Sequence, residues 1–437
     1  LAARRGGDPA PDPRRTGRRG GHGADRGSAA GRGTPAHPRQ RSPGQSLLAG
    51  RNRRGSGDAL GLPRSDWFLA DDVSGALDAG AAFHAAGWRD RLGEAAHDWR
   101  PGTAGELVGV NTESRNLPPS EAAARVAATL AHAASHGARL VFKKIDSTLR
   151  GPVAAELAAV RHSLPGHRIL FCPANPLAGR TVEHGQLLVR GVPLLATEFA
   201  RDPAAPVRDG DLRRIAGGDA DLRIADARDE RDLERAVAAI AARAGPWLAV
   251  GSGALAGPVA RRLGRTVGAS RPQPRPAPGP VLFLGGSAHP LNRTQAERLA
   301  AARGLALIGA EMANPGHAIA AGAAQLQTAG ATVVLAPDAR GQPELIRETL
   351  AAIGAAFIRD HGVRRVFVTG GETARALAAH LGLRELIVAG AIEPGLVLAT
   401  AATPATGPLL FAVKPGGFGD ADTWLRAAAA LGLATET

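Results

Sequence analysis

Several residue types are scarce in this sequence. Among 437 residues there is one cysteine, Cys172, one methionine and no tyrosine, and aromatic residues make up 3%. A single cysteine cannot form an intrachain disulfide or supply a site built from several thiolates, such as a structural zinc or iron–sulfur site. This usage is typical of a reducing compartment, so we expect a cytoplasmic protein.

Long hydrophobic runs are also missing. Hydrophobic residues make up 44% of the chain and charged residues 21%, but no uninterrupted apolar run reaches the roughly 18 residues that a membrane-spanning helix needs. At about 150 residues per domain, the length predicts two or three globular domains. We therefore expect no membrane partner, and the sequence leaves open whether the chain forms homo-oligomers.

The positive charge is concentrated at one end. The net charge is +13, and residues 1–64 contribute fourteen arginines and four aspartates, which leaves +3 for the remainder. Rich in Arg, Gly and Pro and without apolar periodicity, residues 1–64 are predicted to be a disordered extension. A misplaced start of translation is one explanation and a nucleic-acid-binding arm is the other. The lack of interleaved aromatic residues makes nucleic acid the less favoured partner.

From residue 65 onward, short apolar runs alternate with helical patterns, which indicates an α/β protein with largely parallel sheets. The runs expected to be strands are residues 67–70, 140–142, 169–172, 247–250, 281–284, 332–335 and 366–368. Residues 271–280 read RPQPRPAPGP, and proline at every second position forbids a helix or a central strand. We therefore predict a linker there, between domains at 65–270 and 281–437.

Lysine is rare, since only Lys143, Lys144 and Lys414 stand among 53 basic residues. Because arginine is so strongly preferred over lysine in this chain, each lysine suggests a site that needs a compact ammonium group. Lys143 and Lys144 begin the segment KKIDSTLRG at residues 143–151, between an expected strand and an expected helix. Its cations and hydroxyls suit capture of a carboxylate or phosphate, and a solvated basic loop is the alternative.

A pair of acids follows the first expected strand. Asp71 and Asp72 come directly after residues 67–70, at the strand end where ligands bind in open α/β sheets. One of them could simply cap the helix that follows. Two adjacent carboxylates repel each other unless a cation or a hydroxyl-rich ligand compensates them, which favours a functional site.

Glycine-rich turns occur at several strand ends. Gly251-Ser252-Gly253-Ala254-Leu255-Ala256 matches the dinucleotide pattern GxGxxA, which would make the protein an NAD(P)-dependent dehydrogenase, but the expected acidic residue about 20 positions later is missing. Three more loops lie within residues 285–419, around Gly286, Gly370 and Gly416. Such turns let backbone N–H groups approach phosphates, so three of them predict a nucleotide site without a P-loop.

Together these segments resemble the four-carbon acid sugar kinase family, which includes 3-oxo-tetronate and threonate kinases. The resemblance covers about residues 66–430 through six segments in order, namely ADDVSGALDAG (70–80), NTESR (111–115), KKIDSTLRG (143–151), EFARDP (198–203), VTGGETA (368–374) and KPGGFG (414–419). It implies two α/β domains, each a largely parallel sheet flanked by helices, with an acid-sugar-binding domain, a nucleotide-binding domain and an active site in the cleft between them.

The resemblance also implies a reaction and its residues. ATP with Mg²⁺ would phosphorylate a terminal hydroxyl of a tetronate or 3-oxo-tetronate. Asp71 and Asp72 would line the sugar-acid side, and we favour Asp72 or Asp71 as the catalytic base. The other residues implied on the sugar-acid side are Arg115, Lys144, Asp146 and Arg150. Those implied on the ATP side are Ser287, Gly370, Gly371, Glu372, Thr373, Gly416, Gly417 and Lys414. No residue is assigned to a metal, and a lysine that merely covers a turn is the alternative for Lys414.

Several residues depart from the family pattern. Val73 and Ser74 stand where leucine and threonine are usual, and Pro415 stands where serine is common. His289 and Asn292 stand where serine and threonine are common. The residues do not fix which sugar acid is used. A non-catalytic binder of metabolites or nucleic acid and an NAD(P)-dependent dehydrogenase are the alternatives to the kinase.

Overall fold

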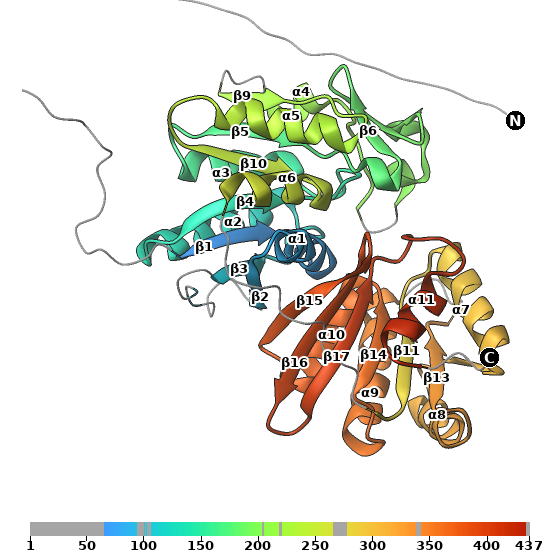
Figure 1. Ribbon diagram of the computed structural model, residues 1–437. Coiled ribbons are helices and arrows are strands. Elements are labelled where there is room, and N and C mark those ends of the chain that lie inside the picture. Colours follow the sequence, from blue (N-terminus) through green and yellow to red (C-terminus); the bar gives the residue numbers. More distant parts are fainter. Residues whose placement is uncertain are drawn as a thin grey trace, which may run out of the picture. The chain divides into compact units, whose positions relative to one another are not determined.

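The structure is a computed structural model. It describes residues 65–93, 100, 102, 106–202, 205–217, 221–264, 278–337 and 342–433. The expected extension at residues 1–64 and residues 271–277 of the expected linker lie outside the described residues. Figure 1 shows strands flanked by helices, and the predicted α/β class with largely parallel strands is confirmed.

Seven neighbouring strands of the main sheet come from the N-terminal half of the chain and pair in parallel. In spatial order they are β2 (Arg89–Gly93), β3 (Glu106–Asn111), β1 (Asp66–Ala70), β4 (Arg139–Lys144), β10 (Trp247–Gly251), β5 (Arg168–Cys172) and β9 (Leu222–Ile224). The expected strands in this half are confirmed as β1, β4, β5 and β10. The sequence patterns did not identify β2, β3 and β9.

Five strands of the C-terminal half also pair in parallel. In spatial order they are β12 (Leu307–Gly309), β13 (Ala331–Leu335), β11 (Val281–Gly285), β14 (Arg365–Thr369) and β17 (Gly407–Lys414). The three expected strands are confirmed as β11, β13 and β14. Because β11, β14 and β17 are neighbours and parallel, the loops that follow them leave the sheet at one edge.

Antiparallel strands join the two halves into one sheet of 14 strands. β17 pairs with β16 (Leu396–Thr403), β16 with β15 (Glu385–Glu393) and β15 with β2, all antiparallel. The last pairing is short, and an ion pair of 2.6 Å between Arg91 and Glu385 supports it. Three successive antiparallel pairs mean that the parallel strands of the two halves run in opposite directions.

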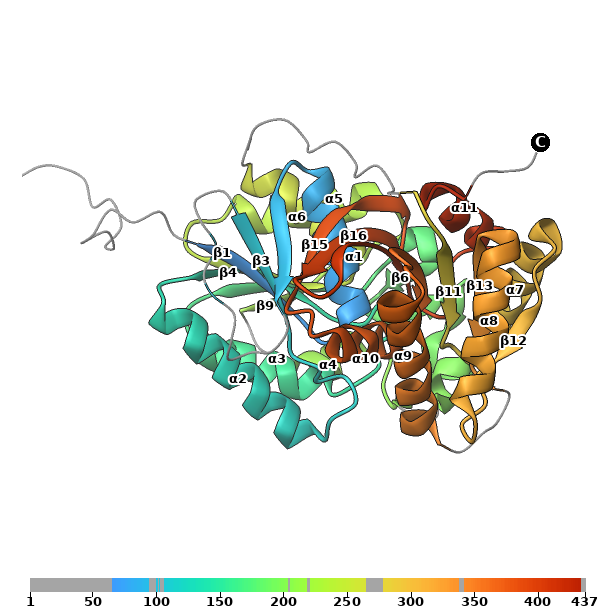
Figure 2. The ribbon, with the colours of Figure 1, turned by 90° about the horizontal axis from the view of Figure 1, so that it is seen from below.

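Helices cover both faces of the N-terminal half. α1 (Val73–Ala85), α6 (Gly253–Leu263) and α5 (Glu230–Ala241) pack in series, whereas α2 (Pro119–Ser135) packs against α3 (Val153–Ser163). Figure 2 shows α5 and α6 on one side of β1, β3 and β4, and α2 and α3 on the other. Burial on both faces explains why these strands read as short continuous apolar runs.

The C-terminal half has the same layering. α8 (Pro315–Ala329), α9 (Pro343–Asp360) and α10 (Gly371–Leu381) pack together, and α7 (Pro290–Arg303) packs with α11 (Thr423–Ala430). Along β11, Leu282 and Leu284 belong to one core, while Phe283 belongs to a second core that contains Trp424. The rings of Phe283 and Trp424 stack with centroids 6.0 Å apart.

A small antiparallel sheet follows β5. It consists of β6 (Arg180–Glu183), β7 (Gln186–Val189) and β8 (Val192–Pro193). The short helices η1 (Pro176–Ala178), η2 (Leu194–Ala196) and η3 (Glu198–Arg201) flank it, and α4 (Leu212–Ala216) comes next. The sequence patterns did not indicate this insertion, which borders the site described below.

The structure shows the environment of the cysteine and the character of the helices. Cys172 is buried and forms no disulfide, and burial raises the pKa of its thiol to about 12. Among the helices that the structure describes, none is long and apolar enough to cross a membrane.

Asp90 is a buried carboxyl near the junction of the two halves. It lies in β2, and its Oδ1 is 3.4 Å from His84 Nδ1 of α1. A Cβ at Gly80 would come within 2.6 Å of Asp90 Oδ2, so glycine leaves room for the carboxyl group. Burial raises the pKa of Asp90 to about 7, and the nearby His84 only partly opposes that rise.

This shift predicts a pH dependence of stability. The pKa of Asp90 is 3.8 when unperturbed and about 7 in the fold, so the folded state holds the proton more tightly than the unfolded state. Stability from this group is present below about pH 4 and is lost as the pH rises towards 7. We expect Asp90→Asn to flatten the profile and to exceed the parent chain at pH 8 by roughly 1–3 kcal/mol.

Urea unfolding between pH 4 and pH 8 measures this effect. Asp360→Asn, at an exposed position at the end of α9, serves as the control and should leave the profile unchanged. Parallel profiles for the parent chain and Asp90→Asn would show that Asp90 does not titrate in this range.

Candidate active site

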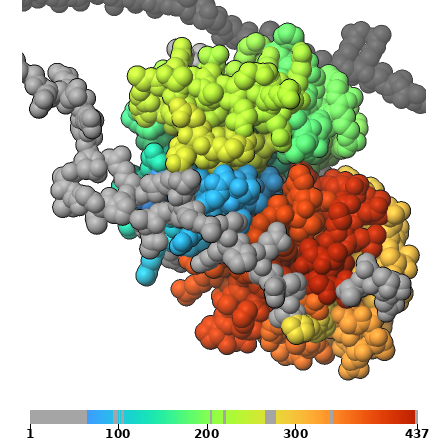
Figure 3. Space-filling model, in the orientation of Figure 1, coloured from blue at the N-terminus to red at the C-terminus, as the bar shows by residue number. Residues whose placement is uncertain are grey.

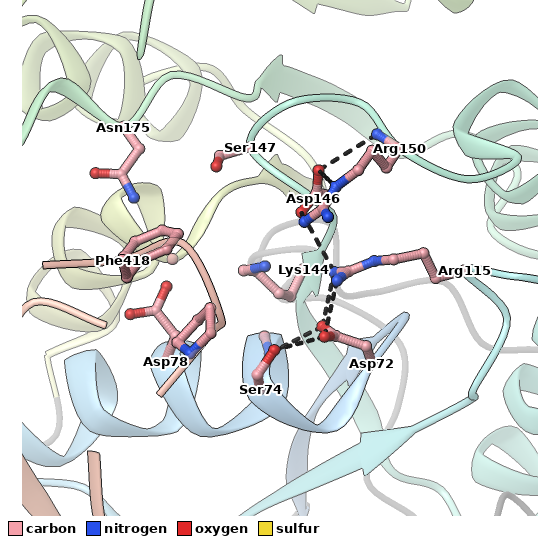
Figure 4. A pocket seen from close by; sticks show the side chains of 13 residues that line it. Asp72, Ser74, Asp78, Arg115, Lys144, Asp146, Ser147, Arg150, Asn175 and Phe418 are labelled. Atoms are coloured by element: carbon pink, nitrogen blue, oxygen red, sulfur yellow. Dashed lines mark hydrogen bonds and ion pairs between the residues drawn. The ribbon is translucent and has the colours of Figure 1, made fainter. Parts of the chain in front are cut away.

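A cavity lies where strands of the N-terminal half end. Its wall contains residues that follow β1, β3, β4, β5 and β10, together with two residues of the loop after β17 (Figure 4). The lining residues are Asp72, Ser74, Gly75, Asp78, Arg115, Lys144, Asp146, Ser147, Arg150, Asn175, Gly253, Pro415 and Phe418. Both halves of the chain therefore contribute to this cavity.

Arg115 holds the two adjacent acids together. Its guanidinium donates to Asp71 at 2.9 and 3.1 Å and to Asp72 at 2.7 and 2.8 Å. Burial alone would raise the pKa of Asp71, but Arg115 and Lys144 outweigh it, so the net shift is downward. Arg115 is the cation that two neighbouring buried carboxylates require.

Asp72 also caps α1. Its Oδ1 accepts from the Gly75 N–H at 2.8 Å, and its Oδ2 accepts from the Ser74 hydroxyl at 2.6 Å. Asp72 therefore caps a helix and also lines the candidate site, so both interpretations of the acid pair apply to this residue. The side chain of Asp72 is 12% exposed and that of Asp71 is 3% exposed, so Asp72 is the acid more open to a ligand.

Asp146 and Arg150 form a second ion pair in the cavity wall. Arg150 donates to Asp146 at 2.9 and 3.0 Å and lies 3.5 Å from Asp202. Burial raises the pKa of Asp146, but Arg150 and Arg115 hold it well below its ordinary value. Arg150 therefore reaches the cavity, as its position predicted, with its guanidinium already bonded to protein carboxylates.

The two neighbouring lysines point to different places. Lys144 lines the cavity, and its Nζ donates to the carbonyl of Ile145 at 2.9 Å. Lys143 forms a buried ion pair of 2.6 Å with Glu156 of α3. Successive side chains of a strand alternate between its faces. The crowding of both lysines in one loop is therefore not found, and only Lys144 belongs to the site.

Asp78 is a cavity residue that the sequence patterns did not single out. It lies on α1, and burial raises its pKa, against the opposing effect of Lys144. A Cβ at Gly253 would lie 1.9 Å from Asp78 Oδ2, so this glycine makes room for the carboxyl group. A carboxylate beside Gly253 disfavours a pyrophosphate there, which argues against the dehydrogenase alternative. The signal for Asp78 was its place in the segment ADDVSGALDAG.

The three glycine-rich loops of the C-terminal half come together, as predicted. A Cβ at Gly286 would lie 2.0 Å from Thr373 Oγ1, and one at Gly416 would lie 1.9 Å from Ser287 Oγ. Close approach of these loops therefore requires glycine at both positions. Gly417 lies against His289, whose Nδ1 accepts from Leu291 N–H and caps α7.

The loop around Gly370 touches the acid pair of the other half. Gly370 has φ of 94°, a conformation that favours glycine, and α10 begins at Gly371. A Cβ at Gly371 would lie 3.0 Å from Ser74 Oγ and 3.2 Å from Asp72 Oδ2. The first turn of α10 is therefore adjacent to the cap of α1.

Two other residues expected on the nucleotide side have protein partners. Glu372 accepts from Asn116 and from Arg347, both at 3.3 Å. Lys414 is fully buried, and its Nζ donates to the carbonyls of Pro415, Gly416 and Phe418 at 2.9 to 3.1 Å. Burial lowers the pKa of Lys414 to about 7. Its ammonium organises the loop from inside, in accordance with the alternative of a lysine that covers a turn.

Comparisons with known proteins agree with this architecture. A sugar-binding N-terminal domain model matches residues 67–223, and a nucleotide-binding C-terminal domain model matches residues 282–424. The fold resembles the crystal structure of a Salmonella typhimurium LT2 protein described as a tRNA synthase, with a TM-score of 0.68 and 20% identity over 83% of this chain and 98% of that chain. The chain thus matches a sugar-binding domain model followed by a nucleotide-binding domain model.

Curated relatives with named activities show which family the chain belongs to. A D-threonate kinase from Bordetella bronchiseptica is 32% identical over 402 residues, which is 83% of this chain and 96% of the relative. A 3-oxo-tetronate kinase from Burkholderia multivorans is 31% identical over 425 residues, with the same two coverages. The chain belongs to the four-carbon acid sugar kinase family. Kinases of this kind are phosphotransferases with an alcohol acceptor.

Removal of Arg115 should strongly destabilise the fold, because it leaves two buried carboxylates without their cation. We expect Arg115→Met to lower the free energy of unfolding by about 3–5 kcal/mol. The control is Arg298→Met, which breaks a half-exposed ion pair with Asp422 of 2.6 Å and should cost at most about 1 kcal/mol. Denaturant melts of both variants measure the difference, and equal losses would contradict a structural role for Arg115.

Proposed function

We propose that this protein is an ATP-dependent kinase that phosphorylates a terminal hydroxyl of a four-carbon sugar acid, either a tetronate or a 3-oxo-tetronate. The observation that carries the proposal is the contact of Gly371 with Ser74 and Asp72. It brings a glycine-rich loop suited to phosphates next to a carboxylate suited to a hydroxyl. The sugar-acid domain comprises residues 65–270 and the nucleotide domain comprises residues 281–437.

The charges of the cavity support binding of a hydroxylated acid. Asp72, Asp78 and Asp146 offer carboxylate oxygens to substrate hydroxyls. Lys144 supplies an ammonium group that makes no ion pair with a carboxylate among the described residues. Charge-assisted hydrogen bonds of this kind are roughly twice as strong as neutral ones.

The glycine-rich loops support binding of ATP. Gly370 to Thr373 open α10, where backbone N–H groups and about half a positive charge attract phosphates. In the adjacent loops, Gly416 lies against Ser287, and Gly417 lies against His289. Among the described residues, no group of three His, Cys, Asp or Glu is arranged to hold a metal ion. We assign no residue to Mg²⁺.

Asp72 is the proposed base of the reaction. It orients the attacking hydroxyl and accepts its proton, while a bond forms between that oxygen and the γ-phosphorus and the bond from the γ-phosphorus to the bridging oxygen of ADP breaks. Phosphoryl transfer depends mainly on positioning and charge neutralisation. Asp72 is favoured over Asp71 because it is more exposed and lies beside Gly371.

A substrate panel tests the proposal. Purified protein, ATP and Mg²⁺ are mixed with each tetronate and 3-oxo-tetronate, and ADP release is followed by a coupled assay. We expect turnover with at least one acid and only background ADP release without acid. Absence of ADP release with every acid, from protein that melts cooperatively, would contradict the proposed function.

Asp72→Asn separates the chemical role of Asp72 from its structural role. Asparagine caps helices about as well as aspartate, so α1 should keep its cap while the base is lost. We expect kcat to fall by roughly 100-fold or more, with ATP affinity nearly unchanged. Steady-state kinetics and nucleotide titration measure the two quantities.

Asp229→Asn is the matched control, because Asp229 caps the exposed start of α5 through a 2.8 Å bond from the Asp232 N–H. This variant should keep full activity. Collapse of ATP affinity in Asp72→Asn would instead place the nucleotide at the acid pair and reverse the roles of the two domains.

A further inference from the structure

Arg180 borders the cavity and takes no part in the mechanism described above. It is the first residue of β6, and its backbone exchanges two hydrogen bonds of 2.8 and 3.0 Å with Asn175, which lines the cavity. In Figure 3 the green surface that includes β6 to β8 lies directly against the red surface of the C-terminal strands and loops. Arg180 contacts Phe418 of the loop after β17 and therefore lies where the two halves meet.

Two aromatic rings contact the Arg180 guanidinium. Its central carbon is 4.8 Å from the ring centroid of Phe418 and 5.9 Å from that of Phe199. Phe418 lines the cavity, and Phe199 belongs to the segment EFARDP at residues 198–203, to which the proposed mechanism gives no role. Contacts with aromatic faces fix the plane of a guanidinium but do not replace oxygen acceptors for its N–H groups.

Arg180 lacks the acidic partners that the other cavity arginines have. It is 9% exposed, its Nε has no hydrogen-bond partner, and no carboxylate forms an ion pair with it within the part of the chain that the structure describes. Arg115 donates four hydrogen bonds to Asp71 and Asp72, and Arg150 is bonded to Asp146. A buried cation without a paired anion is costly unless a ligand supplies that anion.

The charges that face Arg180 come from several elements. Asp146 and Asp78 attract its positive charge from the cavity side, whereas Arg150 and Arg190 repel it. Burial, together with these two arginines, lowers the pKa of Arg180 below its ordinary value. An anion beside Arg180 would offset both the free-energy cost of burying its charge and the repulsion from the two arginines.

We propose that Arg180 binds the carboxylate of the sugar acid and thereby selects acids over neutral polyols. This inference rests on the proposed function, because it names the residue that recognises one end of that substrate. The acceptor hydroxyl lies at Asp72, beside the nucleotide loop. The carboxylate lies at the other end of the molecule, near Asp78, Asp146 and Asn175. Planar guanidinium and carboxylate groups match in a bidentate pair.

The proposal changes the role given to Arg150. The family resemblance implies Arg150 on the sugar-acid side, and a bonded Arg150 still shapes the cavity wall through Asp146 and Asp202. Its hydrogen bonds to Asp146 must break before it can bind a second carboxylate in the same way. Arg180 has no such bonds to break, so it is the better receptor for an anion.

The test compares Arg180→Met with Arg228→Met. Arg228 is an exposed arginine that pairs only with Glu183 of β6 at 3.0 Å among the described residues, so it controls for loss of one positive charge nearby. We expect Arg180→Met to raise KM for the sugar acid by about 10–100-fold and to leave KM for ATP unchanged. Arg180→Lys, which keeps the charge but not the planar fork, should fall between these variants.

Neutral substrates provide the discriminating measurement. The parent enzyme should prefer a tetronate to the corresponding tetritol, and Arg180→Met should lose most of that preference because only the acid has lost a partner. Thermal melts check folding, and calorimetric titration of the tetronate without ATP gives a second measure that does not depend on turnover. Its dissociation constant should also rise at least about tenfold in Arg180→Met.

Three outcomes would overturn the inference. One is an unchanged KM and an unchanged preference in folded Arg180→Met. Another is a loss of kcat alone, which would place the guanidinium at the transferring phosphoryl group. A third is a parent protein that neither binds nor phosphorylates any sugar acid, which would overturn the proposed function as well and is thereby distinguished from the first two.

Discussion

Two adjacent buried carboxylates, Asp71 and Asp72, need a cation, and the structure around the cavity depends on how they obtain it. Arg115 supplies the cation from the loop after β3, while the acids follow β1. Arg115 also lies 3.6 Å from Asp146 after β4, and Arg150 links Asp146 to Asp202. Acids and arginines therefore alternate along one edge of the sheet, and each arginine bridges carboxylates from different segments.

This arrangement explains why so much charge can remain buried. An isolated ion in a protein interior loses several kcal/mol of hydration, and a single ion pair often recovers less than that loss. Here Asp72 accepts further hydrogen bonds from Ser74 and from the Gly75 N–H, and Asp146 accepts one from the Thr148 N–H. The alternating charges stabilise one another and fix the shape of the cavity before a substrate enters.

The sequence predicted the parts of the fold that local chemistry determines. All seven expected strands are present, because buried parallel strands read as apolar runs, and the glycine loops converge because they follow neighbouring parallel strands. β2 was missed because Arg89, Asp90 and Arg91 make it polar, and its pairing with β15 involves residues almost 300 positions away. Long-range pairing of this kind leaves no local pattern.

The candidate site was predictable to a similar degree. Asp72 and Lys144 stood out by residue type and position, and Arg115 came only from the family resemblance. Lys143 could be separated from Lys144 only once the strand faces were known. Arg180 gave no signal in a chain with 50 arginines. What distinguishes it is the absence of an acidic partner among the described residues, and only a structure can show that.

The strand directions in the joined sheet require a bend between its two halves. The parallel strands of the two halves run in opposite directions, so a flat sheet would place their carboxyl ends at opposite edges. Gly371 nevertheless lies against Ser74. The sheet must therefore turn between the halves, and β15 has register shifts around Gly390, where φ is 136°. Bulges bend a strand and increase its twist.

α1 occupies the inside of that turn. It packs on β1, β2 and β3 of one half, on β15, β16 and β17 at the junction, and on α10 of the other half. Gly80 lets Asp90 of β2 and Val388 of β15 approach this helix closely. The same helix begins at Asp72 and contains Asp78, so one element links the bend of the sheet to both ends of the cavity. Packing at the junction thereby determines how near the glycine-rich loops of the C-terminal half can come to the acid pair.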